Sequence, residues 1–552
     1  MKIKSFIIIY IFSVFNLSIS DAKSSEKPDV PEWVNSAVFY QIYPQTFKDT
    51  DGDGIGDLTG IIEKLDYIKS LGVNALWLNP FYESPFCDAG YDVADFYEVA
   101  PRYGTNDIAK QLFVEAHERG IRVIIDFVVG HTSIDHPWFK ASCVNDPKYN
   151  NWYIWTNDTW PTIQPTEYLD KFIKGFAPRN GMYMINFFWC QPKLNYGFER
   201  DDIKYDWQLP TDHPDVMALK DEMKNILKYW LDMGADGFRV DMAGSAGKDF
   251  WLDVRKMMDR NYPESFLISE WGVPADAIEA GFHADFMHWY RGYDDLFHKK
   301  WFTRNENTHS FFEASGKGNI TVFLEEFFDQ HGKLKGNGYI SLPVDNHDMV
   351  RVKNFGRDDK DLEIIYAFQM TFPNIPFIYY GDEIGMRQLP LDERLAVEGS
   401  YGTRSGNRSP MQWNDSKNYG FSSAATDALY LPQDRAENAP TVSKYEANAQ
   451  SLIHKTRKLI KLRKNEKALL PYGDVHILYA EKNKYPFIYS RHFENEIILV
   501  VLNPSQNDVM AKIAFECDAE PELLSGQGIT VIKQRGYTRV VCKGRSYSIF
   551  KY

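Results

Sequence analysis

The sequence from Ala37 onward alternates between short runs rich in β-branched and aromatic residues and longer amphipathic stretches. This alternation predicts repeated strand–helix units whose strands lie parallel in one sheet. Eight units in succession favour a (β/α)8 barrel, the α/β fold known as the TIM barrel. The eight segments with the composition of strands are 37–44, 73–80, 121–131, 237–241, 265–271, 284–290, 338–348 and 376–385.

Amphipathic helices are expected between these strands. One is expected over residues 57–72, with Asp57 near its start, and another over 451–469. The stretch 215–234 places its apolar side chains on one helical face, as a helix that packs against a sheet requires.

Two regions break the alternation. Residues 132–210 are rich in Trp, Tyr, Asn and Pro and have weak periodicity, so we expect an irregular inserted domain there. The barrel would then consist of residues 33–131 and 211–469. Residues 470–552 contain strand-like runs and no long helical pattern, which predicts a small antiparallel β domain at the C-terminus.

The N-terminus has the pattern of a signal peptide. Lys2 and Lys4 precede an apolar run over 5–20, and small residues follow it. We therefore expect residues 1–22 to be removed and the mature chain to be secreted or periplasmic, with no membrane span. The alternative is an uncleaved anchor, although the run is short for a membrane span.

The five cysteines are scattered and odd in number, so no disulfide scaffold is expected. The sequence contains no Cys-x-x-Cys pair, which argues against a zinc ribbon. Cys517 and Cys542 could pair, but the sequence does not decide this.

The formal net charge of −14 argues against nucleic acid as a partner. It is compatible with a neutral or cationic small molecule, and sugars are among the neutral candidates. Aromatic residues make up 15% of the chain, which would suit stacking on sugar rings, but a large core explains them equally well. No protein partner is indicated.

The segment "KDTDGDGIGDL" places an acidic residue at every second position. Its spacing resembles an EF-hand loop, but the twelfth position is Gly60 instead of a bidentate glutamate, and a strand precedes the loop. We expect a single structural Ca2+ here instead of a calcium sensor; the alternative is a glycine-rich turn with solvated aspartates. The expected ligands are Asp49, Asp51, Asp53, the Ile55 carbonyl and Asp57.

Catalytic groups of a barrel gather at the carboxyl ends of its strands. Three carboxylates, Asp241, Glu270 and Asp348, occupy such positions after different strands, so they are expected to share one mouth of the barrel. A pair of carboxyls across a bond is the equipment of retaining glycoside hydrolysis: one attacks the anomeric carbon, and the other, with a raised pKa, protonates the leaving oxygen. Arg239 shares a strand face with Asp241 and should keep it ionised.

Several motifs resemble the α-amylase clan of glycoside hydrolases. "DFVVGH", "GFRVDMAGS", "LISEW" and "PVDNHD" are similar to its four conserved blocks, and "CQPKLNYGF" to a fifth. "DTDGDGIGDL", "SPFCDAGYDVADF", "RYGT", "HTSIDHPWF" and "NRSPMQW" resemble the branch that contains oligo-1,6-glucosidases, maltases, dextran glucosidases and trehalose synthases. The resemblance extends from about Trp33 to the C-terminus.

The resemblance implies a role for each matching residue. Asp241 would be the nucleophile and Glu270 the acid/base, Asp348 would hold the substrate and stabilise the transition state, and Asp126 would orient the site. His131, Arg239 and His347 would contact the sugar in the first subsite.

The non-reducing end of the substrate would be bound by the branch's clamp and stacking tyrosine. These match Asp88, Tyr91 and Arg408. The acidic loop would match the branch's calcium site.

The chain departs from the family pattern at three positions. Gly130 replaces the usual Asn, and Lys193 replaces the usual Asp of the fifth block, so a second calcium between barrel and insert is not expected. Met242 follows the expected nucleophile, where Val accompanies α-1,6 preference and Thr or Ala α-1,4, so the linkage remains open.

The leading interpretation is a secreted retaining exo-α-glucosidase that hydrolyses short oligosaccharides of the maltose or isomaltose type. A glucosyl transferase or isomerase, such as a trehalose synthase, would use the same machinery. An endo-α-amylase is disfavoured by the clamp residues. A non-enzymatic transporter heavy chain is disfavoured because all three carboxylates are present.

Overall fold

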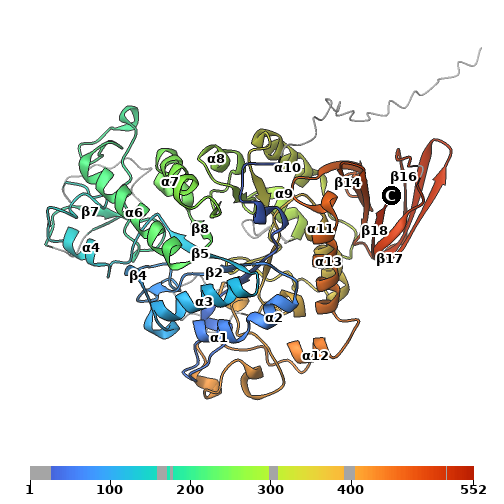
Figure 1. The fold of residues 1–552 in the computed structure, drawn as a ribbon, viewed down its shortest axis with the longest axis horizontal. Coiled ribbons are helices and arrows are strands. Elements are labelled where there is room, and N and C mark those ends of the chain that lie inside the picture. Colours follow the sequence, from blue (N-terminus) through green and yellow to red (C-terminus); the bar gives the residue numbers. More distant parts are fainter. Residues whose placement is uncertain (1–26, 158–170, 175–177, 298–308, 391–403, 518) are drawn as a thin grey trace, which may run out of the picture.

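The computed structural model describes residues 27–157, 171–174, 178–297, 309–390, 404–517 and 519–552 (Figure 1). The predicted signal peptide lies outside these ranges. Among the described residues, no helix combines the length and the apolar composition needed to cross a membrane.

Eight parallel strands form the central sheet and confirm the predicted barrel. They occur in the order β11-β10-β9-β8-β5-β2-β1-β12. The two ends of this order approach each other where the Ile375 amide donates to the Ile340 carbonyl over 3.1 Å, so the barrel is nearly closed. The strands are β1 (Phe39–Ile42), β2 (Ala75–Leu78), β5 (Arg122–Val128), β8 (Gly237–Asp241), β9 (Phe266–Ser269), β10 (Ala284–Phe286), β11 (Tyr339–Ser341) and β12 (Phe377–Tyr379).

Aromatic side chains fill part of the barrel interior. Phe39 stacks on Phe377 with ring centroids 4.3 Å apart, and Trp77 stacks on Phe286 at 5.6 Å. All four side chains are buried. Burial on both faces explains why these strands have nearly continuous apolar runs in the sequence.

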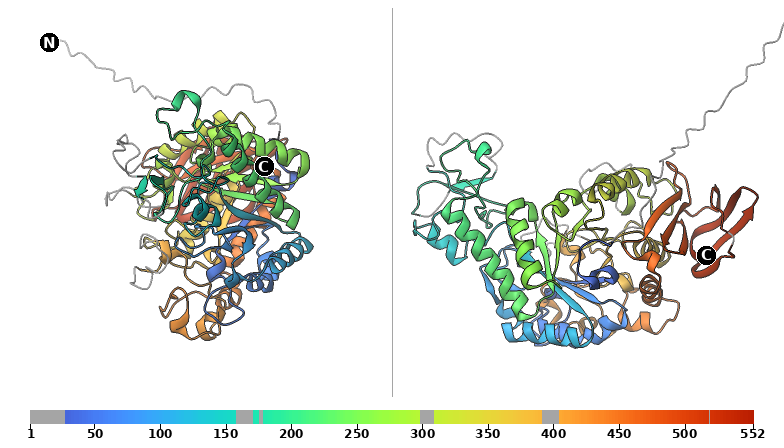
Figure 2. Two further views of the ribbon diagram at one scale, coloured as in Figure 1. Left: turned by 90° about the vertical axis from the view of Figure 1, so that its left-hand side faces the viewer. Right: turned by 45° about the horizontal axis from the view of Figure 1, so that its top comes forward.

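Helices surround the sheet in Figures 1 and 2. The helix expected over 57–72 is two helices that meet at Lys64, and Asp57 caps the first by accepting from the Gly60 amide. The principal helices are α1 (Leu58–Glu63), α2 (Leu65–Ser70), α3 (Asn106–Glu118), α6 (Pro214–Met233), α7 (Lys248–Asn261), α8 (Pro274–Glu279), α9 (Arg291–Phe297), α10 (Thr321–Leu334), α11 (Asp359–Thr371), α12 (Val442–Glu446) and α13 (Leu452–Asn465).

The described part of the chain between β5 and α6 forms a separate lobe, which we call the insert, at the left of Figure 1. It contains α4 (Pro137–Ser142) and a two-stranded pair of β6 (Phe172–Lys174) and β7 (Met182–Met184). Its packing depends on aromatic contacts, such as Phe139 against Tyr183 at 5.0 Å. A bridge between His131 and Lys193 joins the insert to the end of β5.

The C-terminal part is an antiparallel sheet, as the sequence predicts. It packs beside α11 through contacts such as Tyr489 with Thr371, whose hydroxyls lie 2.5 Å apart. Its strands are β13 (Asp474–Tyr479), β14 (Phe487–Phe493), β15 (Glu496–Asn503), β16 (Val509–Ile513), β17 (Glu522–Gln534) and β18 (Tyr537–Lys551).

Candidate active site

A cavity of about 670 Å3 opens between the carboxyl ends of the barrel strands and the insert. Asp241 is the last residue of β8, Glu270 directly follows β9, and Asp348 lies in the loop after β11. The structure therefore brings together the three carboxylates that the sequence predicted would converge. The predicted residues that line the cavity are Asp88, Tyr91, His131, Asp241, Glu270 and Asp348.

Arg239 lies at the centre of the carboxylates. Its Nη1 contacts Asp126 Oδ1 at 2.9 Å and Asp241 Oδ1 at 3.1 Å, while its Nη2 contacts Glu270 Oε2 at 2.5 Å. The guanidinium is 1% exposed, so these contacts are made out of water. One buried cation thus holds three carboxyl groups from neighbouring strands in fixed positions.

The charges around Arg239 set the pKa values of the two predicted catalytic carboxyls. Burial, together with the charges of Glu270 and Asp126, raises the pKa of Asp241 well above its usual value despite Arg239. Burial would also raise the pKa of Glu270, but Arg239 and His288 lower it. This order is the reverse of the one expected from the sequence, because Asp241 is buried beside three other carboxyl groups, whereas Glu270 has both the Arg239 guanidinium and His288 beside it.

Buried hydrogen bonds of Tyr91 hold Asp126 and His347 in place beside the cavity. The Tyr91 hydroxyl lies 3.0 Å from Asp126 Oδ2 and 2.6 Å from His347 Nε2. Burial lowers the pKa of His347 to about 3 and raises that of Asp126 to about 6. His347 is therefore a neutral ring whose position is fixed by Tyr91 and by Gln41.

The arginine that pairs with Asp88 is Arg404, which corrects the prediction of Arg408. Arg404 Nη2 lies 3.1 Å from Asp88 Oδ1, and its Nη1 lies 2.8 Å from Asp348 Oδ1. Arg408 is fully buried and contacts Asp348 at 3.0 Å and the His347 carbonyl at 2.8 Å. Arg404 lines the cavity, whereas Arg408 supports Asp348.

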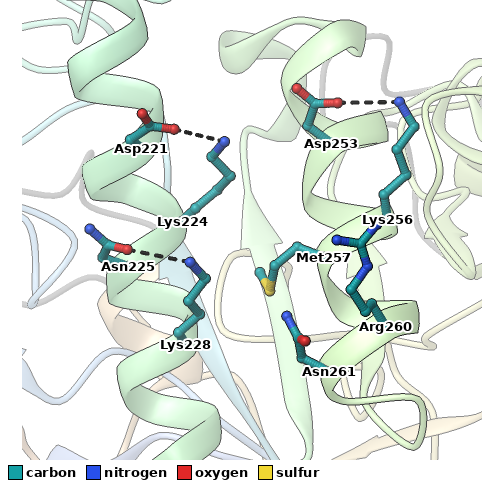
Figure 3. Close-up of a pocket in the computed structure, with 9 residues that line it drawn as sticks. All are labelled: Asp221, Lys224, Asn225, Lys228, Asp253, Lys256, Met257, Arg260 and Asn261. Atoms are coloured by element: carbon teal, nitrogen blue, oxygen red, sulfur yellow. Dashed lines mark hydrogen bonds and ion pairs between the residues drawn. The ribbon is translucent and has the colours of Figure 1, made fainter.

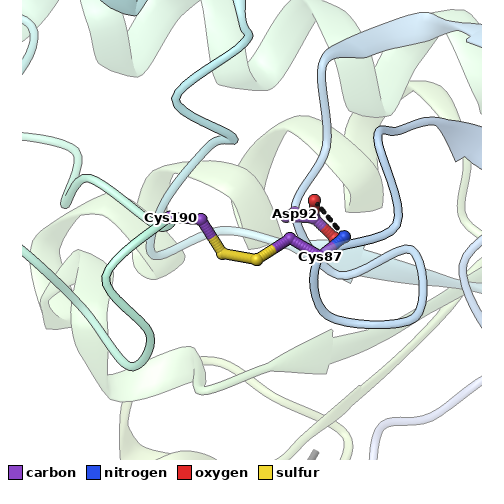
Figure 4. Close-up of side chains that lie close together, drawn as sticks. All are labelled: Cys87, Asp92 and Cys190. Carbon is purple, nitrogen blue, oxygen red and sulfur yellow. Dashed lines mark hydrogen bonds between the residues drawn. A yellow bond between two sulfur atoms is a disulfide. The ribbon is translucent and has the colours of Figure 1, made fainter. Parts of the chain in front are cut away.

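A disulfide between Cys87 and Cys190 joins the Asp88 loop to the insert (Figure 4). Cys517 and Cys542, whose pairing the sequence left open, are both free cysteines and form no disulfide. Asp92 lies beside the disulfide and accepts from the amides of Cys87 and Asp88, each at 2.8 Å. A bond of this kind between residues 103 positions apart cannot be read from the sequence.

Two residues of the insert hold site residues but were not singled out from the sequence. Gln191 donates to Asp88 Oδ2 over 2.8 Å. The Asn186 amide lies 3.0 Å from His131 Nδ1 and 3.6 Å from the sulfur of Met242. A side chain at Gly130 would collide with this amide, so the glycine makes room for Asn186.

The acidic loop gathers part of the predicted calcium ligands. Carboxylate oxygens of Asp49, Asp51 and Asp57 can lie within 4.8 Å of one another. The Asp53 carboxylate lies outside this group and accepts from the Ile55 amide at 2.7 Å, while the Ile55 carbonyl stays a predicted ligand. Burial and neighbouring carboxylates raise the pKa values of Asp53 and Asp57. An all-oxygen cluster whose negative charges repel one another fits Ca2+.

A second cleft, of about 570 Å3, lies between α6 and α7 (Figure 3). Its charged groups pair along their own helices, Lys224 with Asp221 at 2.9 Å and Lys256 with Asp253 at 3.3 Å. No residue predicted for the site lines this cleft, so the catalytic groups meet only in the first of the two.

Comparison with known proteins identifies a family that matches most of the chain. Residues 41–473 match the model of the α-amylase catalytic domain. The chain is 32% identical over 507 residues to a trehalose synthase/amylase of Mycolicibacterium smegmatis, covering 80% of this chain and 78% of that protein. It is 31% identical over 536 residues to the salivary α-glucosidase of Aedes aegypti, covering 86% of each.

An oligo-1,6-glucosidase of Parageobacillus thermoglucosidasius is 30% identical over 547 residues, with 86% of this chain and 91% of that protein covered. Among solved structures, the isomaltulose synthase of Erwinia rhapontici superposes with a TM-score of 0.77 at 25% identity, covering 95% of this chain and 99% of that one.

Proposed function

The chain belongs to the α-amylase family of glycoside hydrolases, and from this premise we propose that it is a retaining exo-α-glucosidase that acts on short α-glucosides. The observation that carries the proposal is the Arg404 guanidinium, which bridges Asp88 and Asp348 in the wall of the cavity. A bridge there would close one end of the cavity and leave room for a single terminal glucose beyond the cleaved bond. An endo-acting enzyme needs a cleft that is open at both ends.

Hydrolysis would proceed in two steps. The Asp241 carboxylate attacks the anomeric carbon, the glycosidic C–O bond breaks, and Glu270 gives its proton to the leaving oxygen. A water then attacks the same carbon, Glu270 takes a proton from it, and Asp241 is released. Asp348 would bind hydroxyls of the glucose, and Arg404 and Arg408 keep it ionised by lowering its pKa despite its burial.

The pKa values of the two carboxyls have to change before the first step. In the free site the pKa of Asp241 is raised and that of Glu270 is lowered, whereas attack requires Asp241 to be ionised and Glu270 to be protonated. Binding of the glycosidic oxygen next to Glu270 would supply an acceptor for a proton on Glu270 and favour its protonated form.

The test is the anomeric configuration of the first product. Proton NMR of a reaction with maltose should show α-glucose before mutarotation. Release of β-glucose would refute the retaining assignment. From maltohexaose, an exo-acting enzyme gives glucose and maltopentaose first, so early release of maltose or maltotriose in place of glucose would refute the exo assignment.

Isomerisation is the second candidate. It is favoured by the aromatic side chains Phe187 and Trp271 in the cavity wall, which could exclude water from the glucosyl-enzyme, and by relatives that are named synthases. Separation of the products from maltose and sucrose distinguishes the two, because an isomerase returns a disaccharide instead of glucose.

Two further properties belong to this proposal. The loop of Asp49, Asp51 and Asp57 would hold a structural Ca2+, since its oxygens converge and lie apart from the catalytic residues.

Export to an oxidising compartment, by means of the N-terminal signal, is supported by the Cys87–Cys190 disulfide. Mass spectrometry of secreted protein would show whether the chain begins near residue 23.

A further inference from the structure

The insert contributes two lysines, Lys171 and Lys193, to the wall of the active-site cavity. Backbone hydrogen bonds fix the segments that carry them. The Ile185 amide donates to the Lys171 carbonyl over 2.7 Å, and the Lys193 amide donates to the Met184 carbonyl over 2.8 Å. The two lysines therefore flank the end of β7 on opposite sides, next to Asn186.

Neither ammonium group has an ion-pair or hydrogen-bond partner among the residues that the structure describes. Burial, reinforced by the charge of Lys171, lowers the pKa of Lys193 to about 8. Lys193 therefore remains mainly cationic at neutral pH. A partly buried cation beside a second one is unfavourable, and an anion in the cavity would relieve both the desolvation and the repulsion.

The position of the lysines indicates which part of a substrate they face. Arg404 bridges Asp88 and Asp348 at the end of the cavity that, in the proposed function, would hold the terminal glucose. The lysines instead adjoin Asn186, whose amide contacts Met242, the residue after Asp241. The leaving part of the substrate would pass along this wall once glucose occupies the closed end.

We propose that Lys193 and Lys171 form an anion subsite for the leaving group. The preferred substrates would be α-glucosides whose leaving group carries a carboxylate, sulfate or phosphate. This inference rests on the proposed glucosidase function and adds a substrate class to it.

A matched pair of substrates tests the charge alone. Maltobionate and maltitol are both open-chain derivatives of maltose, and they differ in a carboxylate against a hydroxymethyl group. A charge-assisted hydrogen bond should raise kcat/KM for maltobionate over maltitol by about tenfold or more. Inhibition of maltitol cleavage by inorganic phosphate or sulfate would instead assign a tetrahedral anion.

Variants show whether the lysines cause the effect. Lys193→Met, Lys171→Met and the double variant should each reduce the preference for maltobionate or the inhibition by phosphate, the double variant most. Lys140→Met is the control, because Lys140 belongs to the insert but pairs with Asp135 at 2.9 Å. If Lys193→Met does not fold, the exposed Lys171 gives the same readout.

Two results would overturn the inference. One is equal kcat/KM for the two substrates with no inhibition by phosphate or sulfate. The other is a preference that survives in the double variant. Failure of the proposed function is distinguishable, because then neither substrate, nor maltose, nor an aryl α-glucoside would be turned over.

Discussion

Arg239 Nη2 lies 2.5 Å from Glu270 Oε2, closer than the 3.1 Å between its Nη1 and Asp241 Oδ1. The same guanidinium therefore stabilises the ionised form of the predicted acid more than that of the predicted nucleophile. This contact and His288 lower the pKa of Glu270, whereas catalysis needs Glu270 to be protonated, so bound substrate has to raise the pKa of Glu270.

Replacement of the nucleophile should remove nearly all turnover. Asp241→Asn keeps the shape of the side chain, but an amide cannot form the glycosyl ester. Labelling provides the check: the unmodified enzyme treated with 5-fluoro-α-glucosyl fluoride should carry the sugar on a peptide that contains Asp241. A label on Glu270 would exchange the two assigned roles.

Loss of the acid should depend on the leaving group. Glu270→Gln should lower kcat for maltose by roughly 10²–10⁴-fold, because proton transfer contributes about that much. An aryl α-glucoside with a good leaving group needs little protonation and should lose less in its first step. An equal loss for both substrates would argue against Glu270 as the acid.

Removal of Arg404 should impair turnover, because Arg404 and Asp88 act as a pair in the cavity wall. Arg404→Met should lower kcat/KM for maltose by roughly 10–100-fold, since it leaves Asp88 without its charged partner. Asp88→Ala combined with Arg404→Met should cost less than the sum of the single effects. Arg387→Met, which breaks a pair with Asp434 outside the cavity, is the control. Additive losses would show that Asp88 and Arg404 do not act together.

Met242 should influence linkage only modestly. It lines the cavity next to Asp241, and its flexible thioether offers neither the hydroxyl of Thr nor the rigidity of Val. Met242→Val should shift the ratio of maltose to isomaltose turnover toward isomaltose, and Met242→Thr toward maltose, within the roughly 10–200-fold range of such contacts. An unchanged ratio in both variants would place the determinant in the insert.

Calcium should raise the melting temperature without entering the rate equation. The ion would bind the folded loop, so stability should rise with its concentration by mass action. Asp51→Asn should abolish the increase, whereas Asp66→Asn, an exposed position outside the cluster, should preserve it. Immediate loss of activity on chelation, with the circular dichroism spectrum intact, would contradict a purely structural ion.

The sequence predicted the features that are repeated or local. The eight barrel strands are buried apolar runs, and the three carboxylates follow from their positions at strand ends. The strands β16 and β17 have many exposed side chains and a weak apolar pattern, so their bounds cannot be predicted from the sequence.

Features that depend on distant contacts could not be predicted. Arg404 and Arg408 are four residues apart, and only the folded chain shows which one reaches Asp88. Asn186 and Gln191 come from the irregular insert, where no periodicity indicates the direction of a side chain. The Cys87–Cys190 pairing depends on how the insert folds back over the barrel.

The disulfide has a mechanical consequence for the cavity. It fixes the width of the wall between Asp88 and Gln191 covalently, so that this side cannot open when product leaves. Asn186, whose backbone amide donates to the Gln191 carbonyl over 2.9 Å, joins the insert to His131 and Ser245 only by hydrogen bonds, which can break and re-form. Any widening of the cavity at the insert would therefore break the contacts of Asn186 with His131 and Ser245, while the bond between Cys87 and Cys190 would stay intact.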